Sequence, residues 1–323
     1  MNGTVKVSIS IFFFTPTWIT TEMEELTNYL KNIIKKGGPE PTEYAELNKY
    51  FQSIGDMIRA DKITRLQIRK LWQLFDESFL KNTMQGLTFN KPHGYAGDFE
   101  IIDKIYTKWV SPEKHLQNWD HFGHWQKATQ AVRNRKDFFK TQLLELESST
   151  AYKPYVLNVG SGPGRDIYEY INQTPQTEIH FECLDMDTKA IGFSQQLLKA
   201  NKSITFTCRN VFRFKTKKQY NLVWSSGLFD YLDDKKFKFL LKSFFSMLAP
   251  TGELIVGNFS DTNPSKDYME FGEWFLHHRS EHKLTELAKE SGFSATSITI
   301  DKEPLGVNLF LRIKKTTSKH KTT

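Results

Sequence analysis

Cysteine is scarce in this chain of 323 residues, and no apolar run in it is long enough to cross a bilayer. The two cysteines, Cys183 and Cys208, fall in apolar, strand-like stretches without histidines at metal-ligand spacing. We therefore expect buried thiols in a reducing cytoplasm and no metal site. The apolar segment from Val5 to Phe14 lacks a small-residue cleavage site, which favours a strand or extended arm over a signal peptide.

Acidic residues are missing from the last ten positions, 314–323, which hold four lysines. Without this tail the formal net charge falls from +7 to +3 (7 minus 4), an ordinary value for a chain of this length. We interpret the tail as a solvated, disordered end. A nucleic-acid-binding protein more often carries a basic stripe on its folded part, with aromatic residues between the charges. The sequence therefore predicts no nucleic-acid partner, and it leaves the oligomeric state open.

Residues 21 to 147 place apolar side chains at helical spacing. The segment Gly37-Gly38-Pro39 ends the first helix, which begins at Thr21 and carries acids in its first turn. Helices are predicted over residues 21–36, 41–59, 64–80, 99–109 and 119–146, the last as one long helix or a helix pair. We expect most of the aromatic residues here to pack in a core.

From residue 154 onward, short apolar runs alternate with helical stretches. Strands are predicted at 155–159, 179–184, 204–208, 220–225, 252–258, 295–300 and 306–313, and helices at about 164, 188–200, 234–248 and 281–291. Such alternation predicts an α/β fold, with a parallel sheet covered by helices on both faces and ligands bound beyond the carboxyl ends of the strands. Three parts follow: a mostly helical region that covers the active site (1–150), the sheet domain (151–313) and the basic tail (314–323).

The segment Val156-Leu-Asn-Val-Gly-Ser-Gly-Pro-Gly-Arg-Asp166 joins a strand to a helix through a glycine turn. Glycines at 160, 162 and 164 let the backbone approach a nucleotide-like ligand closely, because a Cβ there would collide with it. The next apolar run, His180 to Leu184, ends at Asp185, which suits hydrogen bonds to a ribose diol. Dinucleotides and S-adenosylmethionine are both bound in this way, and the glycine turn alone does not separate them.

Later motifs resemble those of class I S-adenosylmethionine-dependent methyltransferases. The glycine turn is similar to their first motif and Leu184-Asp185 to their second, while residues 220–229 resemble their fourth strand and residues 248–256 the turn into the fifth. The motifs fall in the right order across residues 150 to 313, which is stronger evidence than any one of them. A nicotinamide dehydrogenase is disfavoured by the same later motifs.

The resemblance implies a Rossmann-like sheet, S-adenosylmethionine as cofactor, and a set of binding residues. Gly160, Ser161 and Gly162 would contact the methionine and ribose, and Asp185 the ribose hydroxyls. The remaining expected contacts are those of Met186, Asn210 and Val211 with the adenine, and of Ser226 and Gly227 with the methionine. One departure concerns Asn158, where many such enzymes have an acid. An amide there orients the loop without a charge, so we expect a weaker grip on the methionine ammonium.

The nonapeptide Asn90-Lys-Pro-His-Gly-Tyr-Ala-Gly-Asp98 precedes an amphipathic helix. Asp98 suits the cap of that helix, and the glycines suit a turn. A plain turn does not need His93 and Tyr95. If the segment forms a lid over the cofactor, both side chains lie near the reacting atoms.

This nonapeptide points to a narrower family. Together with Gly-Leu-Phe-Asp-Tyr-Leu at 227–232, Ile-Val-Gly-Asn-Phe at 255–259, Asn263-Pro264 and Trp274, it resembles bacterial methyltransferases assigned to the biosynthesis of extracellular factor, 3-hydroxypalmitic acid methyl ester. The resemblance spans residues 85 to 313. It implies methylation of a small molecule, with the carboxyl group of a hydroxy fatty acid as acceptor in the branch that gives the family its name.

Methyl transfer to a carboxylate needs a clamp but no base, whereas an amine or hydroxyl acceptor must lose a proton. His93 suits either role, since it can hydrogen-bond a carboxylate or act as a base. Tyr95 is expected to hydrogen-bond the acceptor or shape its pocket. Arg279 is a candidate carboxylate clamp, with a surface salt bridge as the alternative. Phe229 and Tyr231 are expected to face the substrate or to pack between helix and sheet.

Two other functions stay open at this point. One is N- or O-methylation of a polar metabolite in a natural-product pathway. The other is a catalytically inactive partner subunit that keeps the cofactor fold, which Asn158 favours and which the intact glycine turn and Asp185 oppose.

Overall fold

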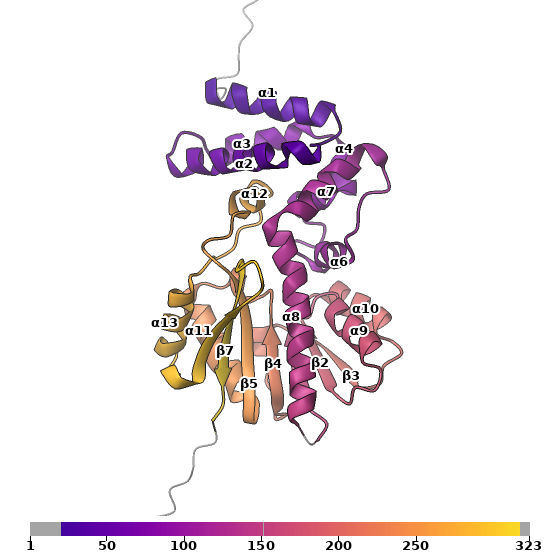
Figure 1. Cartoon of the computed structure of the whole chain (residues 1–323), viewed down its shortest axis with the longest axis vertical. Coiled ribbons are helices and arrows are strands. Elements are labelled where there is room, and N and C mark those ends of the chain that lie inside the picture. The colour runs from indigo at the N-terminus through magenta and orange to yellow at the C-terminus, as the bar shows by residue number, and fades with distance from the viewer. Residues whose placement is uncertain (1–20, 151, 317–323) are drawn as a thin grey trace, which may run out of the picture.

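The computed structural model describes residues 21–150 and 152–316, which form a helical region stacked on a sheet domain (Figure 1). The predicted strand from Val5 to Phe14 lies outside the described residues. Turns of 3₁₀ helix, η1 (Pro41–Glu43), η2 (Trp72–Leu74) and η3 (Lys114–Leu116), join the helices of the first region. These helices are α1 (Thr21–Lys35), α2 (Tyr44–Arg59), α3 (Arg65–Leu71), α4 (Glu77–Asn82), α5 (Met84–Asn90), α6 (Phe99–Thr107), α7 (Gln117–Trp125) and α8 (Lys127–Ser149).

The sheet domain holds a seven-stranded sheet in the order β3-β2-β1-β4-β5-β7-β6. The strands are β1 (Tyr155–Val159), β2 (His180–Asp185), β3 (Ile204–Cys208), β4 (Tyr220–Ser225), β5 (Leu248–Phe259), β6 (Ile298–Lys302) and β7 (Asn308–Lys314). The first five pair in parallel, and β7 runs antiparallel to both of its neighbours. The other elements are α9 (Arg165–Gln173), α10 (Thr188–Leu197), η4 (Val211–Arg213), η5 (Phe229–Tyr231), α11 (Asp234–Ser246), α12 (Lys266–Phe271), α13 (Glu281–Glu290) and η6 (Ala295–Ser297). The predicted α/β class, with its parallel sheet, is confirmed.

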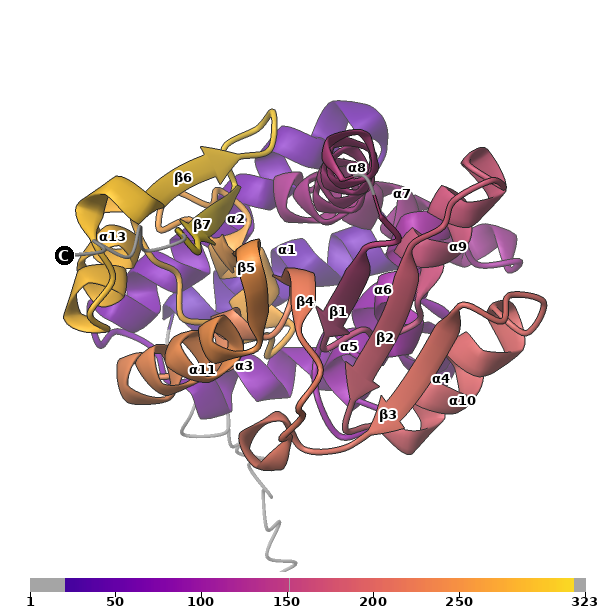
Figure 2. The same ribbon diagram turned by 90° about the horizontal axis from the view of Figure 1, so that it is seen from below.

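Helices cover both faces of the sheet, as the view from below shows (Figure 2). On one face, α8 and α9 bury Phe139, Leu143, Ile167 and Tyr170 against the strands. On the other face, α11 and α13 bury residues such as Phe237 and Leu284. All six residues of β4 are buried, which is typical of a parallel strand covered on both sides. Each large apolar side chain buried in this way contributes about 1.5–3 kcal/mol, and so the sheet gives the site a rigid floor.

Several predicted elements differ from the structure. The helix predicted over 64–80 is interrupted, because Phe75 is extended and Asp76 caps a new helix by accepting from the Phe79 amide (2.7 Å). The stretch 119–146 forms the helix pair α7 and α8, with the break at Gln126. Cys183 is buried as expected, but Cys208 is exposed, because β3 lies at the edge of the sheet.

The start of the basic tail is also ordered. Lys314 is the last residue of β7, and the Lys315 amide donates to the Gly252 carbonyl (2.9 Å). Residues 317–323 of the predicted tail lie outside the described residues.

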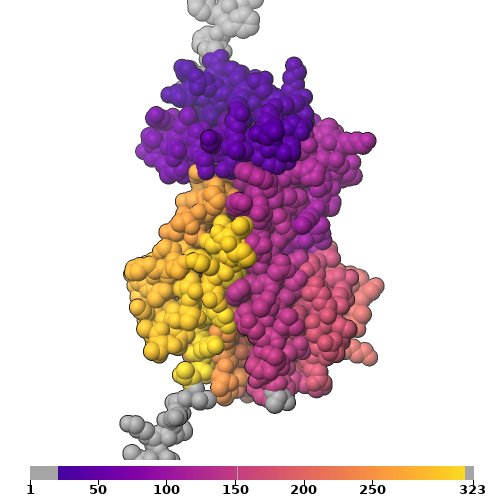
Figure 3. Space-filling model, viewed as in Figure 1, coloured from indigo at the N-terminus to yellow at the C-terminus, as the bar shows by residue number. Residues whose placement is uncertain are grey.

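The two regions are joined by α12, which follows β5 in the chain and packs on α2. Figure 3 shows the resulting continuous contact between the helical region and the sheet domain. The Trp72 indole donates to the Phe271 carbonyl (2.9 Å), and Arg59 pairs with Asp267 (2.7 Å). Arg69 likewise pairs with Glu273. The helical region and the sheet domain, whose predicted boundary is residue 150, thus pack against each other. The helical region is held directly above the carboxyl ends of the strands.

Candidate active site

A cleft of about 540 Å³ lies beyond the carboxyl ends of β1, β2 and β4. Its floor comes from the sheet domain, and its roof and one wall come from the helical region. The structure brings many of the predicted site residues together in it: His93, Tyr95, Gly160, Ser161, Gly162, Asp185, Met186, Ser226, Gly227 and Tyr231. It also adds several that the sequence analysis did not assign: Phe99, Tyr106, Arg135, Asp166, Asp230, Phe259 and Trp274.

The glycine turn forms the floor. Gly160, Gly162 and Gly164 all have positive φ (64°, 52° and 66°), a conformation that side chains with a Cβ rarely adopt. The Gly160 amide donates to the Leu184 carbonyl (2.8 Å), which fixes the turn against the end of β2. No atom lies within 4 Å of the position a Cβ on Gly162 would take, so the turn faces open space. This is the geometry that a ligand approaching the backbone requires.

Asp185 ends β2 beside this turn. Its carboxylate accepts from the Gly162 amide (2.9 Å) and from the Asp187 amide (3.0 Å). Burial raises the pKa of Asp185, and these hydrogen bonds act in the opposite direction. Met186, beside it, is largely exposed (65%) and forms part of the cleft. The carboxylate is thus held in place and retains lone pairs for hydroxyl donors of a ligand.

The end of β1 has an amide, Asn158, where an acid is common, but the first turn of α9 brings an acid, Asp166, next to it. Asn158 is buried, and its amide donates to the Asp166 carboxylate (3.4 Å). Asp166 lines the cleft, and burial raises its pKa to about 6. The sequence Gly164-Arg165-Asp166 was visible from the start, but only the structure turns Asp166 toward the cleft.

Arg135 reaches the same end of the cleft from α8. Its side chain is 95% buried (5% exposed), and its Nε has no hydrogen-bond partner. The guanidinium lies beside Tyr106 and Gly227, where a Cβ on Gly227 would come within 3.1 Å of Nη2. Asp230 lines the cleft nearby, and burial raises its pKa to about 6. No sequence pattern marked Arg135, because α8 has only a weak apolar stripe and the residue lies 25 positions before the glycine turn.

Residues 91–98 form the roof and are held on both sides of the cleft. On one side, the Tyr95 hydroxyl donates to Asp187 (3.2 Å). On the other, the Tyr231 hydroxyl donates to the Ala96 carbonyl (2.7 Å) and accepts from the Trp274 indole (2.8 Å). Burial raises the pKa of both tyrosine hydroxyls, which favours them as hydrogen-bond donors and disfavours a role as bases.

The roof continues into α6, whose first turn is capped. Asp98 accepts from the amides of Glu100 and Ile101 (3.0 Å each), as the sequence predicts. Farther along α6, Asp103 forms a two-point ion pair with Arg165 of α9 (2.7 and 3.1 Å). This pair fixes the roof to the helix that begins at the glycine turn.

His93 lies under this roof. Its Nε2 contacts a carboxylate oxygen of Glu100 (3.2 Å), and its ring packs on Phe99 with a centroid distance of 4.6 Å. Nδ1 is buried and has no partner. One ring nitrogen is thus oriented by a carboxylate and the other is free for a ligand, which is the arrangement expected of an acid–base or hydrogen-bonding histidine.

Four predicted site residues do not line the cleft. Asn210 caps η4, where it accepts from the Phe212 amide (2.9 Å), and Val211 is buried in the core. Phe229 is fully buried between Phe237 and Phe244. The predicted contacts of these residues with adenine and substrate are therefore not supported by their positions.

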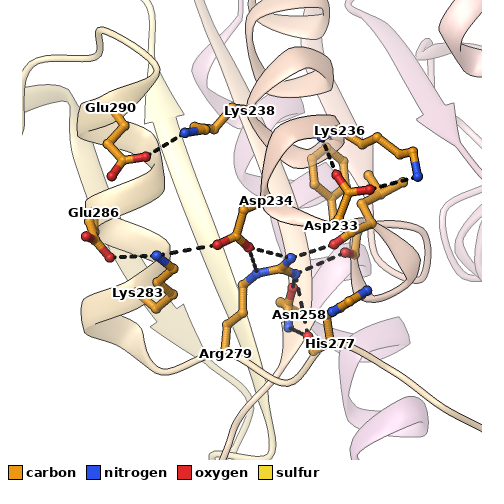
Figure 4. A network of polar contacts seen from close by, with 12 residues as sticks. Asp233, Asp234, Lys236, Lys238, Asn258, His277, Arg279, Lys283, Glu286 and Glu290 are labelled. Carbon is orange, nitrogen blue, oxygen red and sulfur yellow. Dashed lines mark hydrogen bonds and ion pairs between the residues drawn. The ribbon is translucent and has the colours of Figure 1, made fainter.

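Arg279 is the fourth, and its ion pair with Asp234 is buried on the arginine side rather than lying at the surface. It is 4% exposed and lies inside the network of Figure 4. Its guanidinium donates to Asn258 (2.8 Å), to Asp234 (3.0 Å) and to backbone carbonyls of η5 and the residue after it. With its donors occupied in this way, Arg279 holds the segment after β4 against the end of β5.

Behind the cleft lies a second, smaller space of about 60 Å³ inside the helical region, called here the apolar chamber. It shares Phe259 and Trp274 with the cleft. Most of its lining is aromatic or aliphatic, including Phe51, Trp72, Phe75, Phe79, Met84, Ile101, Ile105, Val132 and Met269. The cleft and the chamber are therefore neighbours that share the side chains of Phe259 and Trp274.

Within residues 21–150 and 152–316, no helix is long and apolar enough to span a membrane. The same residues contain no cluster of three or more His, Cys, Asp or Glu side chains that could hold a metal ion.

Residues 156–252 match the family model described as a methyltransferase domain. No curated protein sequence matches the chain. Among solved structures, a possible exported protein from Bordetella parapertussis is similar over 92% of this chain and 96% of its own, with 14% identity and a TM-score of 0.58. That likeness shows that the helical region and the sheet domain recur together as one fold.

Two further similar structures cover less of the chain. The N-methyltransferase NodS from Bradyrhizobium japonicum, in complex with S-adenosylhomocysteine, has 20% identity and a TM-score of 0.41 over 55% of this chain and 86% of its own. The magnesium protoporphyrin IX methyltransferase from Synechocystis, also with bound S-adenosylhomocysteine, has 13% identity and a TM-score of 0.46 over 59% and 88%. The stretch matched by the methyltransferase-domain model, residues 156–252, contains the glycine turn, Asp185 and Gly227 of the cleft.

Proposed function

We propose that the protein transfers the methyl group of S-adenosylmethionine to the carboxylate of a small acyl acid, such as a hydroxy fatty acid. The observation that carries this proposal is that Phe259 and Trp274 line both the cleft and the apolar chamber. A donor bound on the glycine turn would leave the acceptor between the turn and these two side chains. The carboxylate would then lie in the cleft, and the hydrocarbon part would point into the chamber.

The residues of the cleft fit the donor. The glycine turn offers close backbone contact, and Asp185 presents an oriented carboxylate where a ribose diol would lie. Bound S-adenosylmethionine supplies an electrophilic methyl group on a sulfonium, whose loss leaves a neutral thioether. The protein must then align the two reactants and keep water out, and the roof of residues 91–98 serves both tasks.

A carboxylate acceptor needs no base, which agrees with the environment of His93. Its Nε2 is engaged by Glu100, and its free Nδ1 is placed to donate to an acceptor oxygen when the ring carries a proton there. Tyr95 is engaged with Asp187 and therefore closes over the donor in this proposal. Tyr231 and Trp274, which are hydrogen-bonded to each other, form the wall of the cleft on the side of the chamber. We also propose a cytoplasmic location, where the free thiols Cys183 and Cys208 stay reduced.

The size of the chamber favours a second candidate. A space of about 60 Å³ is smaller than the ~150 Å³ cavity that accommodates benzene, so a long chain would require the chamber's side chains to move. A compact polar metabolite needs no such movement. In that case the acceptor would be an amine or hydroxyl, and His93 would remove its proton through Nδ1.

Transfer of labelled methyl from S-adenosylmethionine to small molecules separates the two candidates. Purified protein is incubated with labelled donor and a series of 3-hydroxy acids of increasing length, and in parallel with an extract of polar metabolites. Label that enters the organic phase and is released as methanol by mild base identifies a methyl ester. Base-stable label in the aqueous phase identifies N- or O-methylation instead.

The histidine provides a matched control. His93→Gln keeps a hydrogen-bond donor, but an amide cannot accept a proton as a base. Ester formation should survive this change with a modest loss, whereas methylation of an amine or hydroxyl should fall by about 10²–10⁴-fold. If S-adenosylhomocysteine binds but neither class of acceptor is methylated, the chain is a cofactor-binding subunit and the proposed activity is wrong.

A further inference from the structure

One end of the cleft holds three charged side chains that the chemistry proposed above does not use. Arg135 comes from α8, Asp166 from the start of α9, and Asp230 from η5. All three are buried, with exposed fractions of 5%, 6% and 1%, and all three line the cleft. They lie on the side of the glycine turn where β1 and β4 end, away from Asp185.

The guanidinium of Arg135 keeps hydrogen-bonding capacity that the protein itself does not fill. Its Nε has no partner, and among the described residues no carboxylate lies within ion-pair distance of its guanidinium. A buried donor left without a partner costs free energy, so the free Nε of a side chain that lines the cleft points to a ligand that accepts from it. A Cβ on Gly227 would lie 3.1 Å from Nη2 of Arg135, so the guanidinium lies close to the backbone that follows β4.

Asp166 has free capacity of the opposite kind. One carboxylate oxygen accepts from the Ile167 amide (2.8 Å) and the other from Asn158 at the longer distance of 3.4 Å. A carboxylate has about four acceptor sites, so at least one oxygen can still receive a strong donor. Asp230 is more committed, because it accepts from the Phe259 amide (2.6 Å) and thereby holds the end of β5.

We propose that Arg135 and Asp166 together bind an α-amino acid group, with the guanidinium on its carboxylate and the Asp166 carboxylate on its ammonium. In the reaction proposed above, on which this inference rests, that group is the methionine end of S-adenosylmethionine. Asp166 then replaces the acid that Asn158 lacks, and Asn158 holds Asp166 in position.

The charges at this end of the cleft favour a zwitterion over a lone carboxylate. One guanidinium faces two carboxyl groups, so the cluster has no excess of positive charge. A carboxylate from the acceptor would add a third negative charge beside Asp166 and Asp230, against the single positive charge of Arg135. An α-amino acid brings an ammonium with its carboxylate and leaves the net charge unchanged. The carboxylate of the acceptor is thereby assigned to the His93 side of the cleft.

Three ligands that share the adenosine and thioether but differ at this end test the proposal by calorimetry. S-adenosylhomocysteine has both the carboxylate and the ammonium. Its decarboxylated form keeps only the ammonium, and 5′-methylthioadenosine has neither group. The variants are Arg135→Gln and Asp166→Asn. Arg133→Gln is the matched control, because Arg133 lies on the same helix and its guanidinium contacts His124 instead.

We expect Arg135→Gln to lose at least about tenfold in affinity for S-adenosylhomocysteine and nothing for the other two ligands. Asp166→Asn should weaken S-adenosylhomocysteine and the decarboxylated ligand alike. Both variants should keep the wild-type affinity for 5′-methylthioadenosine, which also shows that they are folded. Arg133→Gln should bind all three as the wild type does.

Two results overturn the proposal. If Arg135→Gln binds S-adenosylhomocysteine like the wild type, the guanidinium serves the acceptor or the fold. If it loses 5′-methylthioadenosine equally, its role is structural. Failure of the proposed function looks different, because it appears in the wild-type protein, either as binding of none of the three ligands or as binding without methyl transfer to any acceptor.

Discussion

The buried amide of Asn158 donates a hydrogen bond to the buried carboxyl group of Asp166, eight residues later in the chain (3.4 Å). This contact joins the end of β1 to the first turn of α9, and the glycine turn lies between them in the chain. The site therefore keeps an acidic group although position 158 is an amide. That group is the carboxyl group of Asp166 on α9, which the amide of Asn158 holds in place.

Asp166→Asn should stabilise the protein at neutral pH. Burial raises the pKa of Asp166 from 3.8 to about 6, so the folded state holds its proton more tightly than the unfolded chain. The ionised carboxylate therefore costs stability, up to about 3 kcal/mol above pH 6, and this cost vanishes below the unfolded pKa near 4. Melting curves should show a gain in Tm for Asp166→Asn at pH 7.5 and none at pH 4. An equal gain at both pH values would contradict this explanation.

Gly97→Ala should disturb the roof of the cleft. Gly97 has φ +70°, and a Cβ there would lie 2.3 Å from the Trp274 ring and 2.7 Å from the Tyr231 hydroxyl. The roof must then move away from its anchor, and we expect the KM for the donor to rise at least about tenfold. Gly94→Ala is the control, since Gly94 also has positive φ (+90°) but open space around it. Both variants should be destabilised by about 1 kcal/mol, because alanine is strained at positive φ. If both change the KM equally, the contact of the roof with Trp274 and Tyr231 is not the cause.

Tyr95→Phe should weaken donor binding without unfolding the site. The change removes only the hydroxyl that donates to Asp187 (3.2 Å), and Asp187 still caps α10 through the Lys189 amide. A hydrogen bond of this kind contributes about 1 kcal/mol, so the Kd for S-adenosylhomocysteine should rise about fivefold in calorimetry. Tyr155→Phe, on the exposed start of β1, should change nothing. A large drop in kcat with unchanged Kd would instead place the Tyr95 hydroxyl in the chemical step.

Arg279→Ala should destabilise the fold by about 3–5 kcal/mol, because it leaves Asn258, Asp234 and buried carbonyls without their donor. Lys283→Ala is the control, since the more exposed Lys283 pairs with the same Asp234 (3.4 Å), and its loss should lower the free energy of unfolding far less than the loss of Arg279. Urea unfolding measures both. The folded fraction of Arg279→Ala should keep the wild-type KM for an acyl acid, and a raised KM at full stability would restore Arg279 as a clamp.

Val132→Phe should block the apolar chamber. Val132 is buried on α8 and lines the chamber, whose volume is only about 60 Å³. We expect shorter acyl acids to be methylated as before and longer ones to lose kcat/KM, with an overpacking cost of about 1–3 kcal/mol. Val132→Ala should shift the preference the other way. Chain-length profiles that do not change in either variant would mean that the hydrocarbon lies elsewhere.

The sequence predicted the parts of this protein that depend on local pattern. The bounds of β1, β3 and β4 are those expected from short apolar runs between turns, and Asp98 caps its helix as expected. The glycine turn and Asp185 meet at the cleft because the carboxyl ends of adjacent parallel strands share one edge of the sheet. Strand spacing, capping and positive φ each depend on a few neighbouring residues, and so they can be predicted from a single sequence.

Only the tertiary structure decided which charged side chains face the cleft. Arg135 and Arg279 are both buried, yet Arg135 has an unpartnered Nε, whereas Arg279 donates to Asn258, to Asp234 and to backbone carbonyls of η5 and the residue after it. The contact of Gly97 with Trp274 and the roles of Asp166 and Phe229 depend in the same way on packing between distant segments. Residue type and spacing fix what a side chain can do. The direction in which it points is set by how α8, α9 and the roof pack on the sheet, and no local pattern records that.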